Sequence, residues 1–291
     1  MAWAHNGPVR LWFERLGDSH DPAVLLLGGA GKQGTDWPDA FCAMLAARGY
    51  GVIRFDQRDT GKSTDFAAMG SDAAGVGAAV AGRSAPVLAY TTADMAADAQ
   101  AVLDEAGVKQ AHLFGRSLGS YIAQLVALAH PERVLSLTLA MAFSRAIGAS
   151  TPSERLAALD AEQFADGPAF VARQLATARA VGNADYFDAD RIAAEAELAW
   201  SRGVHRGAVA RHFSVGLAAA DIRERLADIA APTQVIHGRL DKVIPLALAE
   251  ETAAAIPRAR LSVLDDMAHE GPPQLWERWT DLFAANAARI N

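Results

Sequence analysis

Short apolar runs alternate with amphipathic stretches along most of the chain, which is typical of a largely parallel sheet with helices on both faces. The apolar runs bounded by turn residues predict six buried strands: Ala23–Leu27, Gly51–Phe55, Ala111–Phe114, Val134–Met141, Thr233–His237 and Arg260–Leu264. The stretch Val9–Arg15 alternates loosely and predicts an opening strand at the sheet edge. Helical spacing predicts helices between the strands, at Pro38–Arg48, from a capping box at Thr91 to about Ala106, at Tyr121–His130, and onward from Pro245 and Pro273.

The regular alternation stops between about Ser144 and Ala220, where no strand-like run occurs. The candidate helices of this region are Ser153–Leu159, Pro168–Ala180, Asp188–Trp200 and Gly207–Ala219. A block of helices between two strands of one sheet indicates an inserted cap. We therefore expect an α/β domain formed by residues 1–143 and 221–291, with a helical cap at residues 144–220.

The pentapeptide Gly115-Arg116-Ser117-Leu118-Gly119 lies between a predicted strand and a predicted helix. The pattern G-x-S-x-G in this context indicates a nucleophile elbow, a turn so tight that glycine is needed two residues to either side of the serine. The Ser117 hydroxyl would project above the sheet at the positive end of the following helix. A glycine-flanked serine that only caps a helix is the simpler alternative.

A serine hydroxyl needs a base to take its proton, and in this kind of fold the acid and the base follow the serine along the chain. His269 comes directly after the last predicted strand, where the base is required, whereas the other histidines lie before or beside Ser117, in the cap, or at a strand end. Asp241 follows the penultimate strand by four residues and is expected to orient the His269 imidazole. Asp265 and Asp266 are rivals, but their closeness to His269 along the chain favours the loop surface.

Several glycines follow the first buried strand. In a hydrolase such a loop supplies one backbone N–H group to the oxyanion, and the residue after the nucleophile supplies the other, which predicts Ala30 and Leu118 as donors. Gly29 and Gly31 would let the main chain approach the substrate carbonyl, and Arg116 beside the nucleophile is a further substrate-binding candidate.

The segment Gly29–Gly34 also fits G-x-G-x-x-G, the fingerprint of a dinucleotide site, with Asp56 about 20 residues further on, where a ribose-binding acid would lie. In that fingerprint the helix opens within the glycines, whereas here the next helix is expected to start only at Pro38. An NAD(P)-dependent oxidoreductase is therefore a weaker alternative, and a flexible turn without a binding role is another.

The motifs around Ser117, Asp241 and His269 together resemble the α/β-hydrolase superfamily over essentially the whole chain. Three segments are similar to the anthracycline methylesterases, such as aclacinomycin methylesterase: Trp37–Phe41, Val52–Thr64 and Ser117–Gln124. This resemblance implies cofactor-free hydrolysis of a methyl ester on a bulky aromatic polyketide in antibiotic biosynthesis, with Ser117, Asp241 and His269 as the catalytic triad. Lactonases, C–C hydrolases and cofactor-free haloperoxidases share these motifs. A polyketide decarboxylase or cyclase and a catalytically silent ligand-binding relative are further alternatives.

Substrate preference is expected to depend on the cap and on positions where the sequence departs from that family. Leu118 stands where methionine is frequent, and Gly31 has no side chain where a larger residue is common. In the cap, Arg202 and Arg206 are four residues apart, so a shared helical face would let them hold an anionic or phenolic group of the substrate. The simpler interpretation is a solvated helix face whose arginines pair with acids.

The composition narrows the set of partners. The net charge is −7 and no basic stripe is present, which disfavours nucleic acid. The single cysteine, Cys42, excludes an intrachain disulfide, and no metal-ligand spacing occurs, so we expect no metal. The family resemblance implies that no cofactor is needed either. The start of the chain lacks signal-peptide features, and no apolar run reaches the ~18 residues of a membrane span, which predicts a cytoplasmic protein. The family resemblance implies a small hydrophobic ester as its partner. The oligomeric state is left open.

Overall fold

The computed structural model describes residues 1–70, 78, 83–85, 88–146 and 164–290. An eight-stranded sheet with the order β1-β2-β4-β3-β5-β6-β7-β8 runs through its centre. The strands are β1 Ala2–Asn6, β2 Val9–Leu16, β3 Ala23–Leu27, β4 Gly51–Phe55, β5 Ala111–Arg116, β6 Val134–Ala140, β7 Thr233–Gly238 and β8 Ala259–Leu264. The pairs β1–β2 and β2–β4 are antiparallel and the others are parallel, so the carboxyl ends of β3 to β8 meet at one edge of the sheet.

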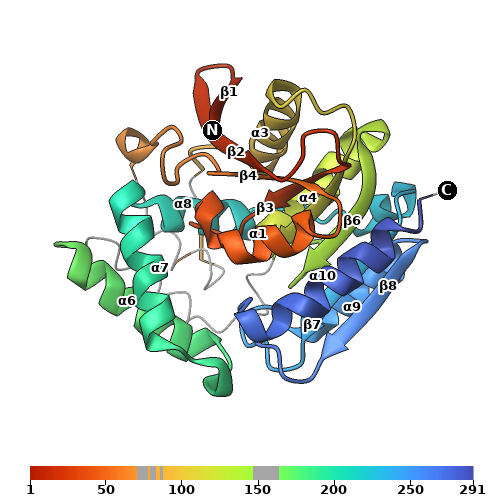
Figure 1. The fold of residues 1–291 in the computed structure, drawn as a ribbon. Coiled ribbons are helices and arrows are strands. Elements are labelled where there is room, and N and C mark those ends of the chain that lie inside the picture. Colours follow the sequence, from red (N-terminus) through yellow and green to blue (C-terminus); the bar gives the residue numbers. More distant parts are fainter. Residues whose placement is uncertain (71–77, 79–82, 86–87, 147–163, 291) are drawn as a thin grey trace.

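Helices cover both faces of this sheet (Figure 1). Helices α1 Asp39–Ala46 and α10 Pro273–Ala287 pack together on one face, and α3 Thr92–Glu105, α4 Leu118–Ala129 and α9 Leu246–Ala255 lie on the other. Because both faces are covered, the apolar strand β3 is buried along its whole length. The neighbours of β3 are β4 on one side and β5 on the other. Ligands of open α/β sheets bind beyond the carboxyl ends of the strands at such a switch point.

The predicted elements of the core agree with the structure, with two corrections. Helix α3 begins as expected, because the Thr91 side chain accepts a hydrogen bond from the Asp94 N–H group and the two residues form a capping box. Pro38, however, is the N-cap of α1 and not its first helical residue. The sheet edge is β1, a five-residue strand that pairs with β2 and buries only Ala4, so its pattern is too short to be recognised from the sequence.

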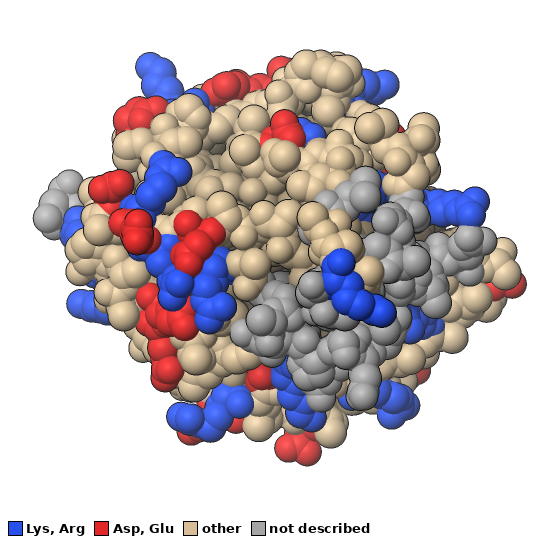
Figure 2. Space-filling view, turned by 180° about the vertical axis from the view of Figure 1, so that it is seen from behind, with Lys and Arg blue, Asp and Glu red and all other residues tan. Residues whose placement is uncertain are grey.

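Among the residues that the structure describes between β6 and β7, where the insertion was predicted, three α-helices occur: α6 Gly167–Val181, α7 Ala189–Arg202 and α8 Ala208–Leu217. Helix α6 packs against α7, and Figure 1 shows both on the side toward which the parallel strands point. The predicted helix Ser153–Leu159 lies outside the described residues. None of the helices that the structure describes is long and apolar enough to cross a lipid bilayer. Acidic and basic side chains are interspersed on the face of the molecule drawn in Figure 2.

Candidate active site

Ser117 lies on the sharp turn between β5 and α4, as the pentapeptide predicts. Its backbone has φ 51° and ψ −123°, a conformation that residues with a side chain rarely adopt and that therefore stores strain. A Cβ atom on Gly119 would overlap the carbonyl oxygens of Leu27 and Gly28, and one on Gly115 would overlap the Gly119 carbonyl group. The two glycines are therefore required for α4 to approach β3 closely enough to form the turn.

His269 lies between Ser117 and Asp241, so the structure brings together three residues that are far apart in the chain. The His269 Nε2 atom is 3.2 Å from Ser117 Oγ, and its Nδ1 atom is 2.8 Å from Asp241 Oδ2. A carboxylate can only accept, so Nδ1 carries the proton and Nε2 is left as the acceptor facing the serine hydroxyl. The main chain at this position is fixed as well, because the His269 N–H group donates to the Val181 carbonyl oxygen at 3.1 Å.

Asp241 is fully buried beneath the imidazole. Its Oδ1 atom accepts hydrogen bonds from the N–H groups of Val243 and Ile244, at 2.8 and 2.9 Å. Burial opposes ionisation of this carboxyl group, but His269 and these N–H groups outweigh it and hold the Asp241 pKa below its usual value. The carboxylate is thus fixed in position and ionised.

The rival acids face other partners. Asp265 pairs with Arg239 on the surface, at 2.6 Å, and Asp266 pairs with Arg278 at 2.5 Å and accepts from the Tyr186 hydroxyl. His237 lies at the end of β7, and its Nε2 atom is 3.0 Å from the Ile244 carbonyl oxygen, so the ring braces the loop that carries Asp241.

The glycine loop after β3 faces Ser117. The Lys32 N–H group donates to the Gly29 carbonyl oxygen at 3.2 Å, and Gly31 has a positive φ of 68°. Within the described part of the chain no hydrogen bond uses the Ala30 N–H group, and the Leu118 N–H group, the first of α4, has no acceptor inside the helix. Both predicted oxyanion donors are therefore available to a ligand.

Two side chains that the sequence did not single out hold this loop. The Gly31 N–H group donates to the His212 Nδ1 atom of α8 at 3.0 Å, and the Gln57 side-chain amide donates to the Gly28 carbonyl oxygen at 2.6 Å. His212 is one of eight histidines in the chain, and Gln57 lies in Val52–Thr64, a segment noted only for its similarity to a family, so only their position in the fold reveals the role.

The geometry of the loop differs from that of a dinucleotide site. Helix α1 begins only at Asp39, after the separate 3₁₀ helix Gly34–Asp36, so no long helix opens within the glycines. Asp56 is fully buried, accepts from the N–H groups of Gly34 and Lys62 at 2.8 Å, and pairs with Arg202. Its carboxylate is already occupied and is not available to a ribose.

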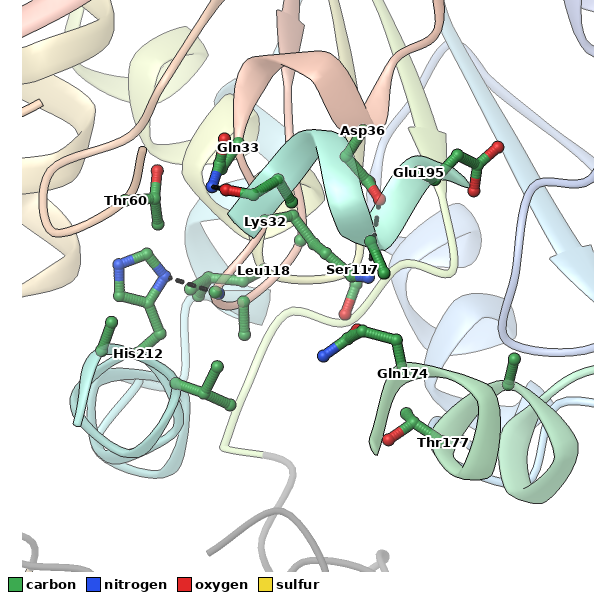
Figure 3. Close-up of a pocket in the computed structure, with 18 of the residues that line it drawn as sticks. Lys32, Gln33, Asp36, Thr60, Ser117, Leu118, Gln174, Thr177, Glu195 and His212 are labelled. Carbon is green, nitrogen blue, oxygen red and sulfur yellow. Dashed lines mark hydrogen bonds and ion pairs between the residues drawn. The ribbon is translucent and has the colours of Figure 1, made fainter. Parts of the chain in front are cut away.

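A cavity of about 330 Å³ lies above Ser117, within the usual size range of small-molecule sites. Its wall includes these predicted residues: Gly29, Ala30, Gly31, Arg116, Ser117, Leu118 and His269. Figure 3 shows Gln174, from α6, facing the glycine loop and Ser117 across the cavity, and Thr177 of the same helix also belongs to the cavity wall. The core thus supplies the reactive groups, and the inserted helices supply the opposite wall.

The arginines singled out from the sequence have partners inside the protein. Arg116 makes a close ion pair with Asp36 and lies over the Trp37 ring, and burial lowers its pKa to about 10. Arg202 is the last residue of α7 and pairs with buried Asp56 at 2.6 Å. Arg206 lies beyond the end of that helix and is exposed, so the expected shared face of Arg202 and Arg206 was wrong.

One group of three possible metal ligands occurs among the described residues: Asp59, Asp65 and His205. Buried Asp59 already pairs with Arg211, at 2.5 and 2.8 Å, and accepts from the Tyr90 hydroxyl at 2.9 Å. The group is thus part of an ion-pair network that joins α8 to the loop after β4.

The fold and this geometry define the class of protein. The family model described as "alpha/beta hydrolase fold" matches residues 22–273, and the chain belongs to this family.

Among its relatives, rhodomycin D methylesterase DnrP of Streptomyces peucetius is 31% identical over 292 residues, which cover 92% of this chain and 91% of the relative. The putative carbamate hydrolase RutD of Variovorax paradoxus is 33% identical over 264 residues, with 89% of each chain covered. The crystal structure of an enol-lactonase from Burkholderia xenovorans LB400 superposes with a TM-score of 0.78 at 21% identity, over 99% of this chain and 100% of that one, and shares the fold.

Proposed function

We propose that this chain is a serine esterase that hydrolyses the methyl ester of a bulky, hydrophobic, polyketide-like small molecule through an acyl-enzyme. The observation that carries the proposal is the 3.2 Å contact between Ser117 Oγ and His269 Nε2 at the wall of the cavity, with Asp241 behind the ring. The 31% identity to DnrP, over nearly the whole length of both chains, supports the methyl ester and the polyketide as substrate.

In the proposed reaction the Ser117 oxygen attacks the ester carbonyl carbon while its proton moves to His269 Nε2. Asp241 stabilises the resulting imidazolium through the Nδ1–H group. The negative charge on the carbonyl oxygen is held by the N–H groups of Ala30 and Leu118, and each such donor is worth roughly 3–4 kcal/mol at the transition state.

The imidazolium of His269 then gives its proton to the ester oxygen, and methanol leaves. The acyl group remains on Ser117 until water, which loses a proton to His269, attacks the same carbonyl carbon. The products are methanol and a carboxylic acid, and the serine hydroxyl is restored. No step needs a group from outside the chain other than water.

We propose further that residues 144–220 act as the substrate-selecting cap over a core formed by residues 1–143 and 221–291. The contribution of α6, α7 and α8 to the cavity wall supports this division. The buried pair Arg211–Asp59 and the His212–Gly31 hydrogen bond support a fixed position of α8 against the core.

A panel of methyl esters, lactones and thioesters assayed with the wild-type protein and its Ser117→Ala variant tests the function. We expect methyl ester hydrolysis that Ser117→Ala lowers by at least about 10³-fold, and labelling of Ser117 by a fluorophosphonate probe. Hydrolysis that survives Ser117→Ala, or a Ser117 that the probe does not label, would contradict the proposed mechanism. Preference for a lactone or thioester over every methyl ester would change the substrate class only.

A further inference from the structure

Lys32 lies in the glycine loop, and its side chain borders the nucleophile. A methyl group placed on Gly29 would lie 3.5 Å from Ser117 Cβ and 3.9 Å from Lys32 Cγ, so the two side chains flank one small volume. Figure 3 shows the Lys32 chain extending across the cavity toward Ser117, with Asp36 beside it and Gln174 opposite. A cation thus stands next to the place where the reacting carbonyl group is proposed to bind.

The ammonium group of Lys32 is weakly compensated. Its ion pair with Asp36 Oδ1 is 3.5 Å long, and the other carboxylate oxygen of Asp36 is in close contact with Arg116. One carboxylate therefore serves two cations. The three N–H donors of an ammonium group are not satisfied by a single distant oxygen, which leaves donors for a ligand in the cavity.

The other charged groups of the cavity wall do not compensate the positive charge of Lys32. They come from four elements, the loop after β4 and the loop before α10: Asp36, Asp59, Arg116, Arg173, Arg191, Glu195 and Glu270. Asp59 is paired with Arg211. Arg191 donates to both carboxylate oxygens of Glu195, at 2.9 and 3.0 Å, so these two side chains compensate each other. Glu270 accepts from the Asn183 N–H group, so its carboxylate is engaged by the main chain, and burial raises its pKa.

The surroundings make the charged form of Lys32 costly in the free protein. Its side chain keeps 44% of its surface accessible to water, and the cavity that it helps to line is partly open. Burial, and then the neighbouring Arg116 guanidinium, lower the pKa of Lys32 to about 8. An anionic ligand would remove this cost, since an opposite charge nearby favours the ammonium form.

We propose that Lys32 binds an anionic oxygen of the substrate, either a carboxylate or an ionised phenol or enol, placed beside the scissile ester. This inference rests on the proposed esterase function and names the class of ester: one that carries an acidic group next to the methoxycarbonyl group. The lysine is thus a specificity residue, and the chemistry of ester cleavage does not depend on it.

Three methyl esters of one ring system test the proposal: methyl hydrogen naphthalene-2,3-dicarboxylate, methyl 3-hydroxy-2-naphthoate and the neutral methyl 3-methyl-2-naphthoate. Each is assayed with the wild-type protein, Lys32→Met and Lys32→Arg. At pH 7 we expect Lys32→Met to lower kcat/KM for the carboxylate ester at least tenfold and for the neutral ester less than threefold. Lys32→Arg should keep the preference, and the hydroxy ester shows whether a phenol is accepted in place of the carboxylate.

The pH dependence supplies a readout that a purely structural role would not give. The wild-type preference for the carboxylate ester over the neutral ester should fall as the pH rises through about 8, because the ammonium group loses its proton. The preference of Lys32→Arg should stay constant over the same range, since a guanidinium keeps its charge. Binding to the Ser117→Ala variant, which cannot turn the esters over, should show the same preference: its dissociation constant should be lower for the carboxylate ester than for the neutral ester.

Equal losses on the charged and neutral esters, or a wild-type protein without preference and without this pH dependence, would overturn the role of Lys32. Turnover of the neutral ester through Ser117 would leave the proposed function standing in that case. Conversely, a charge preference in binding by Ser117→Ala, together with hydrolysis that does not need Ser117, would overturn the proposed function and keep the anion site.

Discussion

The His212 imidazole accepts a hydrogen bond from the Gly31 N–H group at its Nδ1 atom, at 3.0 Å, while its Nε2 atom is 3.0 Å from the Arg58 carbonyl oxygen. Because Nδ1 accepts a hydrogen bond, the ring is neutral and carries its proton on Nε2, which faces the carbonyl oxygen. Burial, partly opposed by Asp59, lowers the pKa of this histidine. One side chain of α8 therefore ties the inserted helices to the loop that carries the proposed oxyanion donor Ala30.

Replacing His212 should therefore impair catalysis without removing a reacting group. We expect His212→Phe to lower kcat for a methyl ester roughly tenfold with a smaller change in KM, since loss of a complete oxyanion donor costs 10²–10³-fold and here the donor is only displaced. His212→Gln offers an acceptor to Gly31 and should recover part of the loss. A drop in the melting temperature with unchanged kcat would show that the residue only stabilises the fold.

The Asp241→Asn variant tests the proton transfer from Ser117 to His269 separately from the oxyanion donors. The Asp241 Oδ1 atom already accepts from two N–H groups, so the amide oxygen of asparagine would take that position and its NH₂ group would face His269. The ring would then carry its proton on Nε2 and could not accept the Ser117 proton. We expect kcat to fall by about 10³–10⁴-fold with little change in stability. Steady-state kinetics and a thermal melt of the same preparation check both parts.

The sequence was sufficient to predict the strands of the parallel core and the meeting of Ser117, Asp241 and His269. The strands are recognisable because burial on both faces leaves nearly continuous apolar runs, as in β3. The three polar residues are recognisable because each follows the carboxyl end of a strand, and those ends converge at one edge. Periodicity and strand order therefore carry most of the information.

Contacts between distant segments were beyond the reach of this reasoning. His212 lies in no recognisable pattern, and Gln57 and Lys32 lie in segments noted for other reasons, Val52–Thr64 and Gly29–Gly34. The roles of all three depend on how α8 and the loop after β4 pack on the glycine loop. Arg202 was misjudged for the same reason. The spacing from Arg206 suggested a common helical face, but α7 ends between them at Gly203, whose φ is 118°. Arg202 therefore pairs with Asp56 from the last turn of the helix, while Arg206 lies beyond it and is exposed.

The same substitution, glycine to alanine, should have opposite effects on stability at Gly119 of the elbow and at Gly216 of α8. Gly119→Ala should destabilise the protein by roughly 4 kcal/mol or more, because its Cβ atom would overlap main-chain oxygens of the β3 loop that cannot move away. Gly216→Ala in α8 is the matched control. A Cβ atom there would meet nothing within 4 Å, so we expect a gain of about 0.5–1 kcal/mol from helix propensity. Denaturant unfolding of both variants measures the difference.

Arg202 and Arg206 should also differ sharply on substitution. Arg202→Met leaves the fully buried Asp56 without its ion pair and should cost about 3 kcal/mol of unfolding free energy. Burial already raises the pKa of Asp56 above its usual 3.8, and loss of Arg202 raises it further, so the deficit should grow as the pH rises above the wild-type pKa of this carboxyl group. The exposed Arg206→Ala should leave stability within about 0.5 kcal/mol of the wild type. Equal effects of the two would contradict this account.

His112 predicts a fall in stability in mild acid that is independent of the active site. It is buried on β5 with Nδ1 2.8 Å from Ser136 Oγ, and burial lowers its pKa from 6.5 to about 4. The unfolded chain binds the proton first, so stability is complete above pH 6.5 and falls by about 3 kcal/mol as the pH decreases to about 4. Chemical denaturation at several pH values in this range gives the free energy of unfolding against pH. This dependence should be shallower for His112→Gln than for the wild type, and substitution of the exposed His5 by glutamine should leave it unchanged.

Gly31 lies where the loop meets α8, and a Cβ atom there would overlap the side chain of Val209 even if the left-handed backbone tolerated it. Positions 31 and 209 are thus sterically coupled across the boundary between core and insertion. Homologues that carry a larger residue at position 31 should compensate with a smaller one at position 209 or with a displaced helix. Engineering of a wider substrate range in this scaffold would therefore have to change the two positions as a pair.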